Sequence, residues 1–166
     1  MKIYISVIII SDRAASGNRA DETIPIIKQW CLDNSFEIFS EYIVSDEKIE
    51  IAQALKKALA EKKTKLIITS GGTGFAARDN TPEVTGEFVE KFTPGIDEYL
   101  RMNSLKVTPF AALSRGISGI AKSKLIINLP GNPNAVLENL QWLEKILSHG
   151  IKLLSQNVDD SEHSFS

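Results

Sequence analysis

The chain has 166 residues, of which 43% are apolar, and it carries a formal net charge of −2. This length and apolar content suit one compact domain with its own core. The acidic balance argues against a nucleic-acid or membrane partner, because both bind clustered lysine and arginine. The single cysteine, Cys31, excludes an internal disulfide and favours a reducing compartment, so we expect a cytoplasmic protein.

Short apolar runs mark the expected strands. The first run, residues 2–10, is rich in β-branched residues and ends at a polar turn, which predicts a buried strand rather than a signal peptide. No apolar run approaches the roughly 18 residues that would span a membrane. The expected strands are residues 2–10, 36–44, 65–69 and 124–128.

Amphipathic helical patterns lie between and after these strands. One helix is expected to begin at Thr81, where threonine can cap, Pro82 suits the first turn and Glu83 favours the dipole. The other helices are expected at residues 21–34, 47–62, 96–106 and from 133 onward.

The alternation of strands and helices predicts an α/β fold. We expect a three-layer sandwich with a mostly parallel central sheet flanked by helices. A single domain would occupy residues 1–155, followed by a polar, frayed tail at residues 156–166. In such a sheet the ligand sites follow the carboxyl ends of the strands. The turns at these ends are residues 11–17, 45–47, 70–83 and 129–133.

The third of these turns contains a glycine loop, Gly-Gly-Thr-Gly at residues 71–74. Glycines let backbone N–H groups approach an anion, and the following helix start adds a positive dipole end. The spacing differs from the P-loop and from the dinucleotide-binding motif. A turn that needs glycine only for its geometry is the alternative, against which the neighbouring Arg78 and Asp79 count.

Two aspartates follow two different strands and could meet at one sheet edge. Asp46 and Asp79 would hold Mg²⁺ beside a phosphate if their carboxylates converge. The alternatives are that Asp46 or Ser45 caps the next helix, and that Asp79 pairs with Arg78 or braces the loop. Spacing alone leaves both interpretations open.

Other polar residues limit the chemistry. Ser114 and Arg115 offer a hydroxyl and a guanidinium to an anion, although a surface arginine is the alternative. The two histidines, His149 and His163, lie near the C-terminus, so an imidazole-assisted nucleophile or a zinc site is not expected. These limits favour transfer between phosphates, whose nucleophile needs positioning and Mg²⁺ rather than deprotonation.

Four ordered motifs together resemble the molybdenum-cofactor biosynthesis family, in particular its molybdopterin adenylyltransferases of the MogA type and the gephyrin G domain. The motifs are residues 11–17, residues 71–74 with 78–83, residues 113–115 and residues 128–131. The resemblance implies a homotrimer that joins ATP and molybdopterin into adenylylated molybdopterin and releases pyrophosphate. It also implies a partner enzyme that inserts molybdate.

The resemblance also implies roles for individual residues. Asp46 and Asp79 would be catalytic and would hold Mg²⁺. Ala77 and Asn80 depart from residues common in relatives, which puts one loop contact in doubt. The implied substrate-binding residues are Ser11, Gly71, Gly72, Thr73, Gly74, Arg78, Thr81, Pro82, Ser114, Arg115, Pro130 and Gly131.

A second hypothesis is a non-catalytic molybdopterin-binding or scaffold module that acts with the molybdate-insertion partner. The string at residues 129–133 also resembles the molybdate-insertion relative, whereas the single-domain length favours the adenylyltransferase. The two aspartates favour an enzyme, because carboxylates beside phosphates repel them unless a metal intervenes.

Overall fold

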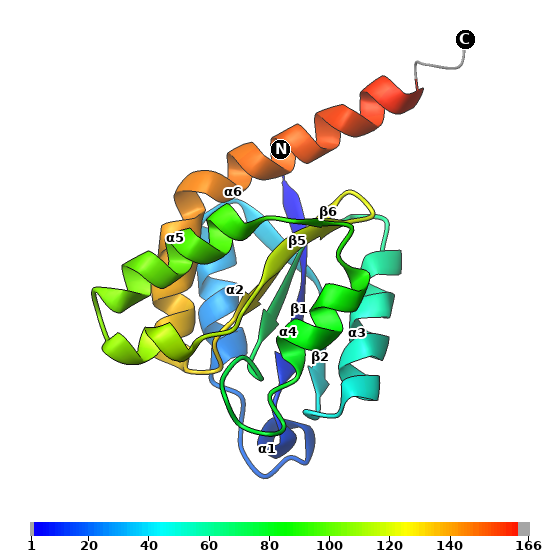
Figure 1. Ribbon diagram of the computed structural model, residues 1–166. Helices are drawn as coiled ribbons and strands as arrows, with labels where there is room; N and C mark the ends of the chain where they lie inside the picture. The colour runs from blue at the N-terminus through cyan, green and yellow to red at the C-terminus, as the bar shows by residue number, and fades with distance from the viewer. Residues whose placement is uncertain (1, 163–166) are drawn as a thin grey trace.

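A computed structural model describes the backbone of residues 2–162 and the side chains of residues 2–155. Within these residues one sheet forms in the order β2-β1-β3-β6-β5-β4 (Figure 1). The first four of these strands pair in parallel, and β5 and β4 join them antiparallel. The strands are β1 (Ile3–Ile10), β2 (Phe36–Val44), β3 (Thr64–Ser70), β4 (Lys91–Phe92), β5 (Ser118–Ala121) and β6 (Lys124–Leu129).

The central strand β1 shows why the sheet is covered on both sides. Its side chains alternate between faces, as in any strand. Ile5, Val7 and Ile9 belong to one buried cluster, and Ile8 and Ile10 belong to another. Two separate cores on opposite faces explain the near-continuous apolar run of this strand.

The helices divide between these two cores. α2, α5 and α6 contribute to the cluster of Ile5, and α3 and α4 contribute to the cluster of Ile8, with the sheet between them in Figure 1. The predicted α/β sandwich of three layers is confirmed. The helices are α1 (Asp12–Ala15), α2 (Thr23–Asp33), α3 (Lys48–Ala60), α4 (Thr81–Phe88), α5 (Pro94–Leu105) and α6 (Pro133–Glu162), with the 3₁₀ helix η1 (Pro109–Leu113).

Some elements were not predicted. β4 and β5 have only two and four residues, too few for a recognisable apolar pattern, and α1 and η1 are similarly short. α6 continues to Glu162, so the expected start of the tail at residue 156 falls inside this helix. Residues 163–166 of the expected tail lie outside the described residues. Among the described helices, none combines the length and apolarity needed to cross a membrane.

The carboxyl ends of the parallel strands meet at one edge of the sheet, toward the bottom of Figure 1. The Gly71 N–H donates to the Leu129 carbonyl over 3.1 Å, and the Ser70 hydroxyl donates to the Pro130 carbonyl over 2.9 Å. On the other side, the Ser11 N–H donates to the Val44 carbonyl over 2.9 Å. The turns expected to form the site are therefore joined by hydrogen bonds across the strand ends.

Candidate functional site

Two adjoining cavities open at this edge. One has a volume of about 450 Å³ and is bordered by the glycine loop, Ser11, Asp46, Asp79 and Gly131. The other has a volume of about 560 Å³ and reaches toward α5, η1 and the start of α6. We call them the aspartate cavity and the η1 cavity. They share Thr73, Gly74 and Asn132, so their contents could touch above the glycine loop.

Thr81 supports the first half of the glycine loop, Gly71 and Gly72, through two hydrogen bonds. The Thr81 hydroxyl donates to the Gly71 carbonyl over 2.8 Å, and the Thr81 N–H donates to the Gly72 carbonyl over 3.1 Å. Thr81 and Pro82 are buried and border neither cavity. The geometry therefore favours a role for both in supporting the loop, and their expected contact with substrate stays a prediction.

Arg115 holds the second half of the loop. Its backbone N–H donates to the Thr73 carbonyl over 2.9 Å, and its Nε donates to the Gly74 carbonyl over 2.7 Å. Its Nη2 donates to the Asp79 carbonyl over 2.7 Å, and its Nη1 pairs with the carboxylate of Glu83. The guanidinium thus has protein acceptors at all three nitrogens. This arrangement favours a positioning role over the expected anion contact, which stays a prediction.

The loop carbonyls are therefore all turned toward the protein, which leaves the N–H groups for a ligand. In the described part of the chain, no acceptor is bonded to the N–H of Gly72, Thr73 or Gly74. All three residues border the aspartate cavity. Successive unpaired N–H groups at the edge of a cavity form an anion-binding concavity. The predicted anion loop therefore has the required donors.

Geometry also demands glycine at two positions of this loop. Gly71 and Gly72 have positive φ angles of 107° and 65°. A Cβ at Gly71 would lie 2.2 Å from the Ile10 carbonyl oxygen, and a Cβ at Gly72 would lie 2.3 Å from Oγ1 of Thr81. Backbone geometry therefore requires glycine here, but this does not decide between the two interpretations, because the same glycines permit the close packing that exposes the N–H groups.

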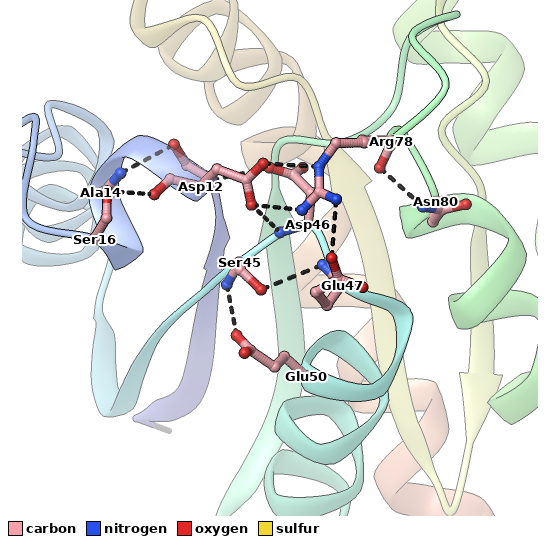
Figure 2. Close-up of polar contacts among 10 residues, drawn as sticks. Asp12, Ala14, Ser16, Ser45, Asp46, Glu47, Glu50, Arg78 and Asn80 are labelled. Atoms are coloured by element: carbon pink, nitrogen blue, oxygen red, sulfur yellow. Dashed lines mark hydrogen bonds and ion pairs between the residues drawn. The ribbon is translucent and has the colours of Figure 1, made fainter.

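Asp46 lies between β2 and α3 and is half-buried. Its Oδ2 accepts from the Asp12 N–H over 2.9 Å, and its own N–H donates to Oδ1 of Asp12 over 3.0 Å (Figure 2). Burial, followed by the like charges of Asp12 and Asp79, raises the pKa of Asp46, against the lowering effects of the Asp12 N–H and of the Arg78 charge. Capping of α3 is not its role, since no side-chain bond caps that helix.

Asp79 follows the glycine loop and faces the same cavity. Its Oδ2 accepts from the Ala76 N–H over 2.9 Å, which braces the loop as one alternative proposed. No ion pair joins Asp79 to Arg78 among the described residues. Asp79 is close enough to Asp46 for its negative charge to raise the Asp46 pKa. The two carboxylates therefore converge on one cavity while Asp79 also shapes the loop.

Arg78 points away from both cavities. Its Nε and Nη2 donate to the two carboxylate oxygens of Asp12 over 2.8 and 2.9 Å, and its Nη1 donates to Glu47 over 2.9 Å (Figure 2). Donating hydrogen bonds to the carboxylates of Asp12 and Glu47 raises the pKa of Arg78, and accepting those bonds lowers the pKa of Asp12. Substrate contact by Arg78, expected from the sequence, stays a prediction that this geometry does not favour.

The remaining predicted residues border one cavity each. Ser11 and Gly131 border the aspartate cavity, and Ser114 and Pro130 border the η1 cavity. The Ser11 hydroxyl also caps α1 by accepting from the Ala14 N–H over 3.3 Å. Sequence reasoning missed Asp12 as an individual residue, although it lies in the motif at residues 11–17. Its hydrogen-bond partner, Arg78, lies 66 residues away in the chain, so the local sequence does not indicate the contact.

The carboxylates fit a Mg²⁺ ion shared with phosphates. Among the described residues, no hydrogen bond uses Oδ1 of Asp46 or Oδ1 of Asp79. No group of three metal-binding side chains occurs in the part of the chain that the structure describes. Mg²⁺ commonly binds one or two carboxylates and completes its shell with water and substrate phosphates. Two carboxylates beside an anion loop match this pattern.

Comparison with known proteins identifies the family of the chain. A family model described as a probable molybdopterin binding domain matches residues 6–155. The chain is 40% identical over 158 residues to a molybdopterin adenylyltransferase of Helicobacter pylori, covering 93% of this chain and 89% of that protein. It is also 40% identical over 159 residues to the molybdenum cofactor synthesis protein cinnamon of Drosophila melanogaster. That match covers 94% of this chain but only 26% of the longer protein.

A solved structure shows the same fold. The molybdopterin biosynthesis enzyme MoaB of Thermus thermophilus superposes with a TM-score of 0.87 at 36% identity, covering 93% of this chain and 97% of that one. The matched residues 6–155 include both aspartates, the glycine loop and the other turns of the two cavities. The chain belongs to the molybdopterin-binding family of molybdenum-cofactor biosynthesis, which its motifs had indicated.

Proposed function

We propose that this protein is a molybdopterin adenylyltransferase, which transfers AMP from ATP to the phosphate of molybdopterin and releases pyrophosphate. One observation carries the proposal: the unpaired N–H groups of residues 72–74 and the carboxylates of Asp46 and Asp79 border one cavity. The bacterial relatives named molybdopterin adenylyltransferases, matched over most of their length, support the same activity.

The two cavities suit two substrates. The aspartate cavity, with its amides and carboxylates, would take the phosphates of ATP together with Mg²⁺. The η1 cavity would take the pterin, because it combines apolar side chains such as Leu100 and Leu113 with polar groups such as Ser114 and Asn139. The shared border at Thr73 and Gly74 would bring the pterin phosphate to the α-phosphate of ATP.

The proposed reaction is a single displacement at phosphorus. An oxygen of the molybdopterin phosphate bonds to the α-phosphorus of ATP, and the bond from that phosphorus to the α–β bridging oxygen breaks. Pyrophosphate carries away the bond's electron pair. The attacking oxygen is already anionic, so no side chain needs to remove a proton. None of the described residues that border the two cavities is a histidine, and this displacement needs none.

The chain's own groups would orient the substrates and balance charge. The N–H groups of Gly72, Thr73 and Gly74 would donate to phosphate oxygens, and Arg115 and Thr81 would keep them in place. Asp46 and Asp79 would hold Mg²⁺, which supplies charge neutralisation at the phosphates when bound.

The decisive experiment is release of pyrophosphate by purified protein supplied with ATP, Mg²⁺ and molybdopterin. We expect pyrophosphate and adenylylated molybdopterin in equal amounts. Molybdopterin binding without pyrophosphate above background would contradict the enzyme and support the scaffold hypothesis. ATP hydrolysis without an adenylylated product would contradict both the proposed acceptor and the scaffold.

We further propose a homotrimer. Several large apolar side chains on one segment are exposed, which supports contact between copies of the chain. They are Phe92, Met102 and Leu105, none of which borders the η1 cavity. Sedimentation equilibrium should give three times the mass of 18.3 kDa, and a monomer would contradict this assembly. A cytoplasmic location and a molybdate-insertion partner stay predictions.

A further inference from the structure

We propose that Asp12 and Arg78 are positioning residues that hold the loops of the two metal-binding aspartates together. This inference rests on the proposed function, because it assigns Asp46 and Asp79 to the metal. It gives Arg78 a role other than substrate binding. It also gives Asp12 a role of its own, that of orienting other residues, rather than capping a helix or lying exposed without a function.

The first half of the connection joins Asp12 to Asp46. Each residue donates its backbone N–H to the carboxylate of the other, over 2.9 and 3.0 Å. This reciprocal pair joins the turn after β1 to the turn after β2 (Figure 2). One oxygen of Asp46, Oδ2, is thereby held in place, and the other is left for a ligand. The orientation of Asp46 therefore depends on the position of Asp12.

The second half joins Asp12 to the loop of Asp79. Arg78 donates to both carboxylate oxygens of Asp12 through Nε and Nη2, and to Glu47 through Nη1. Arg78 directly precedes Asp79, so its backbone fixes where the Asp79 loop lies relative to the turn of Asp46. Bidentate pairing adds directional restraint that a single ion pair lacks. Through Asp12 and Arg78, the turns after three strands are connected.

Charge explains why a cation is needed here. Asp12, Asp46, Glu47 and Asp79 lie in one region, and such carboxylates repel one another. Arg78 offsets part of this repulsion through direct bonds to two of them. Asp46 and Asp79, the two that border the cavity, have no cationic partner among the described residues. The arrangement compensates the outer carboxylates and leaves the inner pair for Mg²⁺.

The position of Arg78 argues against direct phosphate binding. Its three guanidinium nitrogens all have carboxylate partners. Neither Arg78 nor Asp12 nor Glu47 borders the aspartate cavity. A phosphate would have to displace two carboxylates to reach the guanidinium.

The test measures binding without turnover. Wild type and the variants Arg78→Ala, Arg78→Lys and Asp12→Asn are titrated with α,β-methylene-ATP, once with Mn²⁺ and once with a chelator. We expect Arg78→Ala to weaken binding of the Mn²⁺ complex by roughly tenfold, as for other residues that orient metal ligands. Binding of the metal-free analogue should change much less. Arg78→Lys keeps the charge but cannot fork Asp12, so it should lose most of the same affinity.

Controls separate positioning from charge and from folding. Lys57→Ala removes one exposed positive charge from the last turn of α3, away from both cavities, and should leave both titrations unchanged. Thermal unfolding checks that each variant folds. If Arg78→Ala does not fold, Asp12→Asn takes its place in the titrations. In the double variant Asp12→Asn with Arg78→Lys, the losses should be less than additive, because both changes break one connection.

Two outcomes would overturn the proposal. If Arg78→Ala weakens the metal-free analogue as much as the Mn²⁺ complex, Arg78 binds phosphate directly. If the folded variants bind the Mn²⁺ complex like wild type, the connection does not position the aspartates. Failure of the proposed activity would appear separately, as wild-type protein that binds the Mn²⁺ complex but releases no pyrophosphate.

Discussion

Two carboxylate sites have opposite surroundings: the carboxylate of Glu61 with its hydroxyl donors, and the pair Asp46 and Asp79 at the aspartate cavity. We call them the two clusters. At the end of α3, Glu61 accepts from four hydroxyl groups, so both of its oxygens are engaged. The donors are Tyr42 at 2.5 Å, Ser6 at 2.7 Å, Ser40 at 2.9 Å and Thr64 at 2.9 Å. Asp46 and Asp79 each accept one backbone N–H and keep one oxygen without a bond in the described part of the chain.

The pKa values of Glu61 and Asp46 shift in opposite directions. Burial acts to raise the pKa of Glu61, but the hydrogen bonds from its hydroxyl donors together lower it below the ordinary value of 4.5. Burial and neighbouring carboxylates instead raise the pKa of Asp46. The protein thus stabilises Glu61 as an anion, whereas the Asp12 N–H and the charge of Arg78 offset only part of the effects that raise the pKa of Asp46. The contrast supports the proposed functional role of Asp46 and favours a structural role for Glu61.

The largest expected effect separates the two clusters directly. Asp46→Asn and Asp79→Asn should each lower kcat for adenylylation by roughly 10²–10³-fold, because each removes a preorganised charge at the phosphates. Glu61→Gln should leave kcat unchanged. Pyrophosphate release measures all three, and circular dichroism confirms folding. Full activity in both aspartate variants would contradict the metal role.

The glycine loop provides the next test. Gly72→Ala forces an alanine to a φ of 65°, which costs about 1–2 kcal/mol, and sets its Cβ against Thr81. The displaced N–H groups should lower kcat/KM for ATP by about tenfold, equivalent to ~1.4 kcal/mol. Gly95→Ala is the matched control, since its Cβ would meet nothing within 4 Å. Equal activity of the two variants would argue against the loop as the phosphate site.

Glu61 should matter for stability instead. Glu61→Ala removes the acceptor of four hydroxyls, two of them from the buried Ser6 and Thr64, and should lower the free energy of unfolding by about 2–3 kcal/mol. Urea unfolding measures the loss, and kcat should not change. Loss of activity in a Glu61→Ala protein that stays folded at the assay temperature would contradict a purely structural role for Glu61.

The same carboxylate predicts a pH dependence. Because the folded-state pKa of Glu61 lies below 4.5, its stabilisation is present above pH 4.5 and is lost as the pH falls through the lower folded value. Wild type should therefore lose its stability advantage over Glu61→Gln in this acidic range. Urea midpoints at successive pH values check this. An advantage that grows on acidification would reverse the sign of the argument.

The smallest expected effect compares two serine hydroxyls. Ser114→Ala, in the η1 cavity, should raise KM for molybdopterin by roughly fivefold, as for one lost hydrogen bond, without changing stability. Ser40→Ala, in the Glu61 cluster, should cost about 1 kcal/mol of stability without changing KM. An unchanged KM in Ser114→Ala would contradict a contact between Ser114 and molybdopterin and would favour the alternative of a surface residue.

Much of the fold followed from residue patterns. The buried strands were predicted within one residue at each end, because parallel strands covered on both faces require continuous apolar runs. The predicted start of α4 at Thr81 is confirmed, but its predicted capping by Thr81 is wrong: Asn80 is the N-cap residue, and the Thr81 hydroxyl donates to the Gly71 carbonyl instead. The β4–β5 pair was missed, since its pairing depends on the long-range position of Lys91 and Phe92 beside β5 rather than on their own sequence.

The candidate site divides in the same way. By itself, the sequence determined that a glycine loop and two aspartates lie at one sheet edge, because chain order and strand direction dictate that placement. Only the tertiary structure shows which groups the two arginines contact. Arg78 meets Asp12 across 66 residues and Arg115 meets Gly74 across 41, and both guanidinium groups support loops rather than face a cavity. Local sequence shows an arginine's charge, but its partners are brought to it by the packing of distant strands.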